Sequence, residues 1–164
     1  MYASFDDYTA LYDPIDEKVF NNLAYEAGRI MDVQTTGIDN VRKLKRFFPL
    51  DEDDAEAVRR CASKLVNTMH QIQEAEAAAA MGRGYTKTEQ GLRRQIISRV
   101  ESGNEAISYS ETKSAATAID TAAADPAARE KLLAGIVTAS LRGVRDANGV
   151  NLLYMADYPR RYLC

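Results

Sequence analysis

The feature of this sequence that most constrains the fold is a long apolar stripe between residues 53 and 81. Apolar side chains recur there at steps of three or four residues: Val58, Cys61, Leu65, Met69 and Ile72. An α-helix turns once about every 3.6 residues, so this spacing places all five on one helical face. A long helix with one apolar face needs other helices to cover that face. The stripe therefore predicts a mainly α fold, a small helical bundle.

Capping residues predict where two further helices begin. Ser4 and Asp7 have the spacing of a capping box, which predicts a short helix over residues 5–12. The dipeptide Asp13-Pro14 suits the cap and first turn of a second helix, over residues 15–34. The apolar side chains of this second helix also recur at helical spacing, so we expect one of its faces to be buried.

A basic segment and an acidic run separate this helix from the long one. Gly37 is expected to end the helix over residues 15–34 in a left-handed conformation, and Asp39 to cap a short basic helix. We expect the basic side chains of residues 42–46 to point away from its apolar ones. The carboxylates at 51–54 suit the first turn of the long helix, where they face the positive end of its dipole. A calcium-binding loop would instead have its acidic ligands at alternating positions, so the consecutive carboxylates of this run do not predict a calcium site.

Residues 83–113 lack a long apolar stripe and are expected to form a loop or insertion. Two alternating stretches flank the turn Ser102-Gly103-Asn104, which predicts a β-hairpin at about 95–110 that protrudes from the bundle. The stretch 83–99 is also basic, with five Lys or Arg residues against Glu89. A solvated loop, a contact to nucleic-acid phosphates and a docking surface for an acidic protein all fit this charge.

The C-terminal part predicts one more helix and an extended tail. Asp125-Pro126 opens a helix with an apolar face around Leu133 and Val137, and Gly143 is expected to end it. Residues 114–124 are weakly patterned, and Asn148-Gly149 predicts a turn. We expect one helical domain over residues 1–156. Residues 157–164 form a C-terminal tail in this prediction, because Pro159 favours an extended chain.

Composition and motifs argue against several functions. The 164 residues carry a net charge of −3, which disfavours a globally basic nucleic-acid binder. The single histidine, His70, has no second histidine with which to hold a metal, and Gly82-Arg83-Gly84 lacks the residues of a phosphate-binding loop. The two cysteines do not make a disulfide framework, and no secretory signal or membrane span is visible. The sequence therefore predicts no enzyme, no catalytic residue, no metal and no cofactor.

Four segments, in order along the chain, resemble the head–tail connector (adaptor) proteins of long-tailed bacteriophages. The first is the opening, Tyr2-Ala3-Ser4-Phe5-Asp6-Asp7-Tyr8. The second is the helix with Phe20, Ala27, Ile30 and Met31, followed by Thr35-Thr36-Gly37. The third, residues 100–110, is similar to the family's Ser-x-Gly-x-x-x-hydrophobic-Ser-Tyr-Ser hairpin. The fourth is Asn151-Leu152-Leu153-Tyr154, which follows the last helix and Gly143.

The resemblance implies a structural virion protein of the neck, at the head–tail interface, assembled in the host bacterial cytoplasm. Such subunits form a homo-oligomeric ring, usually twelvefold, below the portal protein. The ring extends the DNA channel and docks the head-closure (stopper) or tail-completion protein. DNA is expected to pass through without specific binding, and no membrane is involved.

The residues expected to make contacts lie in the hairpin region and the tail: Arg93, Arg94, Arg99, Gly103, Asn104, Tyr109, Tyr158, Arg160, Arg161 and Tyr162. Tyrosine and arginine are common interface anchors. A ring also needs two different complementary faces, for which the basic segments 42–46 and 83–99 and the acidic run 51–56 are candidates. The alternative is a small DNA-binding protein that uses the basic segment 83–99, and its affinity for DNA would fall steeply with salt.

Overall fold

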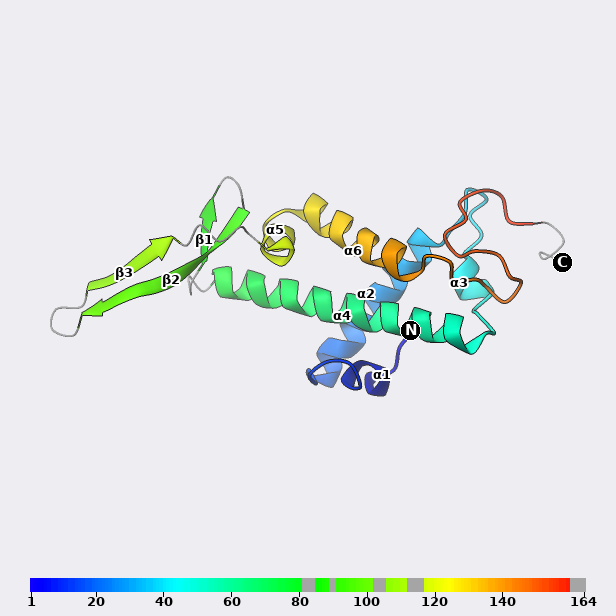
Figure 1. Ribbon diagram of the computed structural model, residues 1–164, viewed down its shortest axis with the longest axis horizontal. Helices are drawn as coiled ribbons and strands as arrows, with labels where there is room; N and C mark the ends of the chain where they lie inside the picture. Colours follow the sequence, from blue (N-terminus) through cyan, green and yellow to red (C-terminus); the bar gives the residue numbers. More distant parts are fainter. Residues whose placement is uncertain (81–84, 89–90, 102–105, 112–116, 160–164) are drawn as a thin grey trace. The chain divides into compact units, whose positions relative to one another are not determined.

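The computed structural model describes residues 1–80, 85–88, 91–101, 106–111 and 117–159, with side chains for residues 1–80 and 117–159. In this part of the chain, the elements (Figure 1) are α1 (Phe5–Thr9), α2 (Glu17–Gln34), α3 (Lys43–Arg46), α4 (Glu52–Ala80), β1 (Tyr85–Thr88), β2 (Gly91–Glu101), β3 (Ala106–Glu111), α5 (Ala118–Ala124) and α6 (Pro126–Ser140). The predicted mainly α fold is confirmed.

The chain divides into two compact units. The first combines Met1–Asn67 with Leu133–Cys164, and the second is Thr68–Leu132. Helices α4 and α6 each run from one unit into the other. The second unit contains the predicted insertion at 83–113 and extends beyond it in sequence on both sides. The first unit contains the segments at both ends of the chain, so residues distant in sequence build its core.

The apolar stripe of α4 is buried along its whole length, as the sequence predicted: Val58, Cys61, Leu65, Met69 and Ile72. In the first unit, α2 buries its own stripe, which includes Phe20, Leu23, Ala27 and Met31. Helix α1 adds Tyr8, whose ring centroid lies 5.5 Å from that of Phe20. Buried aromatic and aliphatic side chains of this kind supply most of the stabilisation of a small core.

The predicted cap of α1 is confirmed, and the predicted start of α2 is wrong. Ser4 and Asp7 form a capping box. Helix α2 begins at Glu17 rather than after Asp13, because Asp16 accepts hydrogen bonds from the N–H groups of Lys18 and Val19 at 2.9 and 3.2 Å. A cap residue has to lie directly before the first turn, and Asp16 has that place.

Three predictions for the segment after α2 are also wrong. Gly37 does not adopt the left-handed conformation; Asn40 does, with a φ of 60°. Helix α3 has no side-chain cap, because Asp39 directs its carboxylate to other backbone N–H groups. Lys43 does not point away from the apolar residues but is buried among them. Asparagine tolerates the left-handed region better than other non-glycine residues, which permits the tight turn at Asn40.

The ends of the C-terminal helices combine confirmed and missed signals. Helix α6 begins at Pro126 as predicted, and Gly143 after it has a φ of 87°. Gly149, in the predicted turn, has a φ of 76°. Helix α5 was not predicted, although Thr117 and Asp120 form a second capping box at its start. The alanine-rich stretch has no apolar periodicity, so only the cap residues Thr117 and Asp120 could have predicted this helix.

The three strands form an antiparallel sheet in the order β1-β2-β3 (Figure 1). Strands β2 and β3 pair with a register shift between Ile97 and Arg99. The paired residues, from Gln95 to Glu111, nearly coincide with the segment 95–110 for which a hairpin was predicted, although β2 begins earlier, at Gly91. The predicted turn at 102–104 lies outside the described residues. Residues 85–88, expected to be loop, form β1. That the hairpin protrudes from the bundle stays a prediction.

We expect Leu65→Ala to lower the free energy of unfolding by about 2–5 kcal/mol, because it removes a fully buried side chain and leaves a cavity. Urea denaturation followed by circular dichroism measures the change. Lys64→Ala, at the exposed neighbouring position, is the matched control and should change stability by less than about 0.5 kcal/mol. Equal unfolding midpoints for both variants would contradict the burial of this face.

Candidate interaction surfaces

The structure places the predicted contact residues unevenly. Four lie in the sheet: Arg93 pairs with Thr86 and Arg94 with Tyr85 between β1 and β2, while Tyr109 pairs with Ile97 and Arg99 with Ser108 between β2 and β3. Five others lie outside the described residues: Gly103, Asn104, Arg160, Arg161 and Tyr162. The sheet therefore brings the first four onto neighbouring strands, and Tyr158 alone lies elsewhere.

Tyr158 was predicted to belong to an extended tail that is free for a partner, and this prediction is wrong. Its side chain is 2% exposed. Its ring stacks on Phe47 with centroids 4.9 Å apart, and its hydroxyl donates to Asp146 Oδ2 at 2.5 Å. Its backbone N–H donates to Asp39 Oδ2 at 2.7 Å. Burial of the ring against Phe47 and the hydrogen bond of the hydroxyl to Asp146 stabilise this conformation, so the segment folds back on the domain.

Asp146 is the polar centre of this packing. Its Oδ1 atom accepts from the backbone N–H groups of Asn148 and Val150, both at 2.9 Å, and so closes the turn that contains Gly149. Its Oδ2 atom accepts from Tyr158, whose hydroxyl oxygen in turn accepts from Asn148 Nδ2 at 3.0 Å. A buried carboxylate is tolerated only when its oxygens are hydrogen-bonded, and here both are.

Lys43 is the charged partner of this region. Burial lowers the pKa of its ammonium group, and the nearby charges of Asp146 and Asp39 oppose that shift. The ammonium group also donates to the backbone carbonyl of Tyr154. A buried lysine that donates to a carbonyl of its own chain and is compensated by the charges of two nearby carboxylates is structural in this setting.

The loop at 37–40 is attached to the C-terminal segment by main-chain contacts. The N–H group of Ile38 donates to the carbonyl of Met155 at 3.0 Å. Asp39 joins the same two segments through Tyr158, and the Tyr158 N–H group lowers the pKa of the Asp39 carboxyl below its ordinary value. The C-terminal segment therefore fixes the loop that follows α2.

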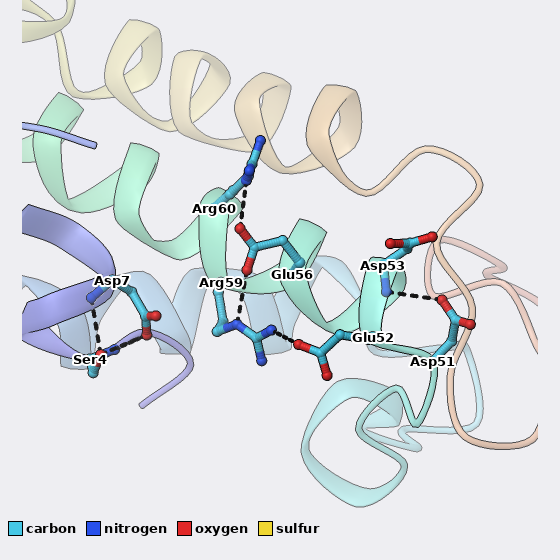
Figure 2. A network of polar contacts seen from close by, with 8 residues as sticks. All are labelled: Ser4, Asp7, Asp51, Glu52, Asp53, Glu56, Arg59 and Arg60. Atoms are coloured by element: carbon cyan, nitrogen blue, oxygen red, sulfur yellow. Dashed lines mark hydrogen bonds and ion pairs between the residues drawn. The ribbon is translucent and has the colours of Figure 1, made fainter. Parts of the chain in front are cut away.

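The start of α4 carries an acidic surface that is held by its own hydrogen bonds (Figure 2). Asp51 accepts from the N–H groups of Asp53 and Asp54, which confirms capping as the role of the acidic run. Glu52 pairs with Arg59, and Glu56 pairs with both Arg59 and Arg60.

The two arginines on Glu56, Arg60 first, lower the pKa of its carboxyl, so it stays charged in weakly acidic solution. The start of the helix presents more carboxylates than cations to solvent. Glu56 and Arg60, one helical turn apart, form an ion pair at 2.7 Å.

Cys61, His70 and the possible metal ligands are the candidate reactive groups of the described residues. No group of three or more His, Cys, Asp or Glu side chains there could hold a metal ion. Burial raises the pKa of the Cys61 thiol to about 11, which leaves it protonated and unreactive at neutral pH. His70 lies 3.7 Å from Glu74 of the same helix. Along these residues, no helix has the length and apolar character needed to span a bilayer.

Neither a scan against models of known protein families, nor a search of curated proteins, nor a search of solved structures found a match.

Sequence reasoning missed the polar cluster of Asp39, Lys43 and Asp146. Each residue has an ordinary local role in the sequence: a cap, a basic face and a turn. The one local signal was the spacing Asp146-x-Asn148-Gly149, which is typical of a turn closed by an aspartate side chain. Asp146 acts on the charge of Lys43 from more than one hundred residues further along the chain, and no periodicity carries that information.

We expect Tyr158→Phe to lower the free energy of unfolding by about 1–3 kcal/mol, because Asp146 loses a buried hydrogen-bond donor while the ring packing remains. Chemical denaturation measures the change. Tyr154→Phe is the matched control, since the Tyr154 side chain is exposed. If both substitutions had the same small effect, the Tyr158–Asp146 bond would not stabilise the fold.

The lowered pKa of Asp39 gives an acid-dependent contribution. A carboxyl with a folded-state pKa below its ordinary 3.8 stabilises the fold above that pH and loses the contribution as the pH falls through the folded-state value. Asp39→Asn should therefore be less stable than the parent at neutral pH. The difference should shrink below about pH 4. Asp13→Asn, an exposed carboxylate, is the control, and a difference independent of pH would contradict the assignment.

Proposed function

We propose that this chain is a structural virion protein, a head–tail connector (adaptor) subunit of a long-tailed bacteriophage. The observation that carries the proposal is the order of the four family-like segments, which together span residues 2–155. Their packing supports it: Tyr8 of the first and Phe20 of the second contact each other in the core, and Leu152 of the fourth is buried. If the chain shares the fold of this family, the residues in the family-like segments would be needed to build the core and not for a catalytic reaction.

In this proposal, the subunits form a homo-oligomeric ring, about twelvefold on the virion, under the portal protein in the neck. The ring extends the DNA channel and docks the head-closure or tail-completion protein. A ring is built from a heterologous interface, in which one face of a subunit meets a different face of its neighbour. The antiparallel pair β2–β3 is the contact element for the next protein, because it includes the family-like hairpin segment.

The charge distribution favours this function over DNA binding. The net charge is −3, and the start of α4 exposes several carboxylates. A channel that held DNA phosphates tightly would impede DNA ejection, whereas an acidic wall repels them and a neutral wall does not attract them. The alternative, DNA binding through the basic segment 83–99, stays open to the experiment that follows.

Replacing residues 101–106 by a neutral linker tests the proposal. We expect the variant to keep its far-UV helicity, because residues 101 and 106 belong to strands and the segment between them is outside the described helices, and to fail to join tails to DNA-filled heads that carry the portal. Co-sedimentation with such heads and electron microscopy of the neck measure attachment, with the unaltered chain as the control. Attachment equal to that of the control would overturn the contact role.

A second measurement separates the two functions. Fluorescence anisotropy with a DNA duplex should show negligible binding by the full chain near physiological salt. Strong binding that weakens steeply as salt is raised would instead support the DNA-binding alternative.

A further inference from the structure

A polar groove lies between the C-terminal turns of α2 and the loop 36–42. Its volume is about 390 Å³, and it is lined by Arg29, Asp32, Val33, Thr36, Asn40 and Arg42. All of these residues belong to the first compact unit. None of them contributes to the polar cluster around Asp146, so the groove is a separate feature.

The loop wall of the groove is held in place by its backbone. Thr36 and Arg42 pair as an antiparallel bridge, and the N–H group of Gly37 donates to the carbonyl of Val41 at 3.3 Å. Asn40, which lines the groove, has a φ of 60°. Asparagine adopts this left-handed conformation more readily than other non-glycine residues, so the turn at Asn40 is a regular part of the loop. The groove is therefore preformed.

The groove combines positive charge with exposed apolar surface. Arg29 and Arg42 contribute two guanidinium groups against the single carboxylate of Asp32, which accepts from the Tyr2 hydroxyl at 2.5 Å. Arg29 also forms an ion pair with Glu26 at 3.1 Å, but an exposed pair of this kind contributes little to the free energy of folding. Val33 in the groove is 62% exposed and Ile38 in the loop is 76% exposed. A matching partner would present carboxylates beside one apolar side chain.

The chain itself carries such a segment, the acidic turn at residues 50–53. Leu50 is 83% exposed, the highest value among the large apolar side chains of the described residues. Asp51, Glu52 and Asp53 follow it, all exposed (Figure 2). The cap that Asp51 provides fixes the backbone here, so the turn would lose little freedom on binding.

We propose that the groove binds the acidic turn of a second copy of this chain. Leu50 covers Val33 and Ile38, while carboxylates of the turn meet Arg29 and Arg42. None of the residues 50–53 lines the groove. A contact that engages one groove and one turn in each pair is heterologous and propagates into a ring or an open array, whereas a reciprocal exchange would close as a twofold dimer. This inference deepens the proposed function and rests on it only for the expectation that the contacts close into a ring. The self-association itself is argued from the groove and the acidic turn.

Charge reversal on both sides tests the pairing. We expect the full chain to self-associate in sedimentation velocity, and Arg42→Glu and Asp53→Lys each to weaken association roughly tenfold or more, since attraction becomes repulsion. The double variant Arg42→Glu/Asp53→Lys should associate again, because it restores opposite charges. Lys45→Glu and Glu17→Lys make the same charge changes at exposed positions outside both surfaces and should associate like the parent.

Salt provides an independent readout. Association of the parent should weaken between about 0.1 M and about 1 M salt, where the Debye length falls from about 10 Å to about 3 Å. A parent that stays monomeric at all concentrations, or single variants that associate like the parent, would overturn the proposal.

The proposal and the connector function fail in different ways. Association with the expected charge dependence but no attachment to DNA-filled heads would contradict the connector function alone. Attachment to heads by the Arg42→Glu variant in complete rings would contradict the docking alone, since the ring would then use another face.

Discussion

The buried carboxylate of Asp146 is the interaction on which the C-terminal part of the first unit depends. One oxygen closes the turn that follows α6, and the other accepts the Tyr158 hydroxyl. Its charge also compensates Lys43, which burial would otherwise force toward the neutral form. Without this carboxylate, the N–H groups of the turn and the Tyr158 hydroxyl would lose their acceptor. Lys43 would keep its hydrogen bond to the Tyr154 carbonyl but would lose a compensating negative charge.

This arrangement links the end of the chain to the surface after α2. The Tyr158 N–H group donates to the Asp39 carboxylate, and the Met155 carbonyl accepts from the Ile38 N–H group. The loop 36–42, one wall of the polar groove, therefore takes its position from a segment more than one hundred residues further along the chain. A substitution at Asp146 should therefore alter the conformation of the loop 36–42, although the two are far apart in sequence.

Features that depend on neighbouring residues could be predicted from the sequence. The stripe of α4 and the capping box at Ser4 are patterns within a few turns, and both are confirmed. The left-handed Gly143 follows from the end of a helical pattern. The α2 cap was misplaced because Asp13 and Asp16 both lie before the helix, and only the chain path decides between them. Helix α5 was missed because alanine-rich sequence gives no apolar period.

The candidate surfaces were harder to predict, because they depend on contacts between distant segments. Tyr158 looks like a free interface anchor in sequence, since tyrosine beside arginine is typical of interfaces. Only the cavity offered by Phe47, Asp39 and Asp146 explains why it is buried. The groove has the same origin: Arg29 and Arg42 are thirteen residues apart and meet because the loop returns on α2.

Rigidity connects these observations to assembly. A subunit that joins a ring loses translational and rotational freedom at every contact, and any loop that also had to become ordered would add to that cost. Here the Asp51 cap fixes the acidic turn, and the C-terminal segment fixes the groove wall. Both proposed surfaces are therefore formed before they meet. Substitutions at Asp146 or Tyr158 should then weaken self-association without touching either surface, because they would loosen the groove wall.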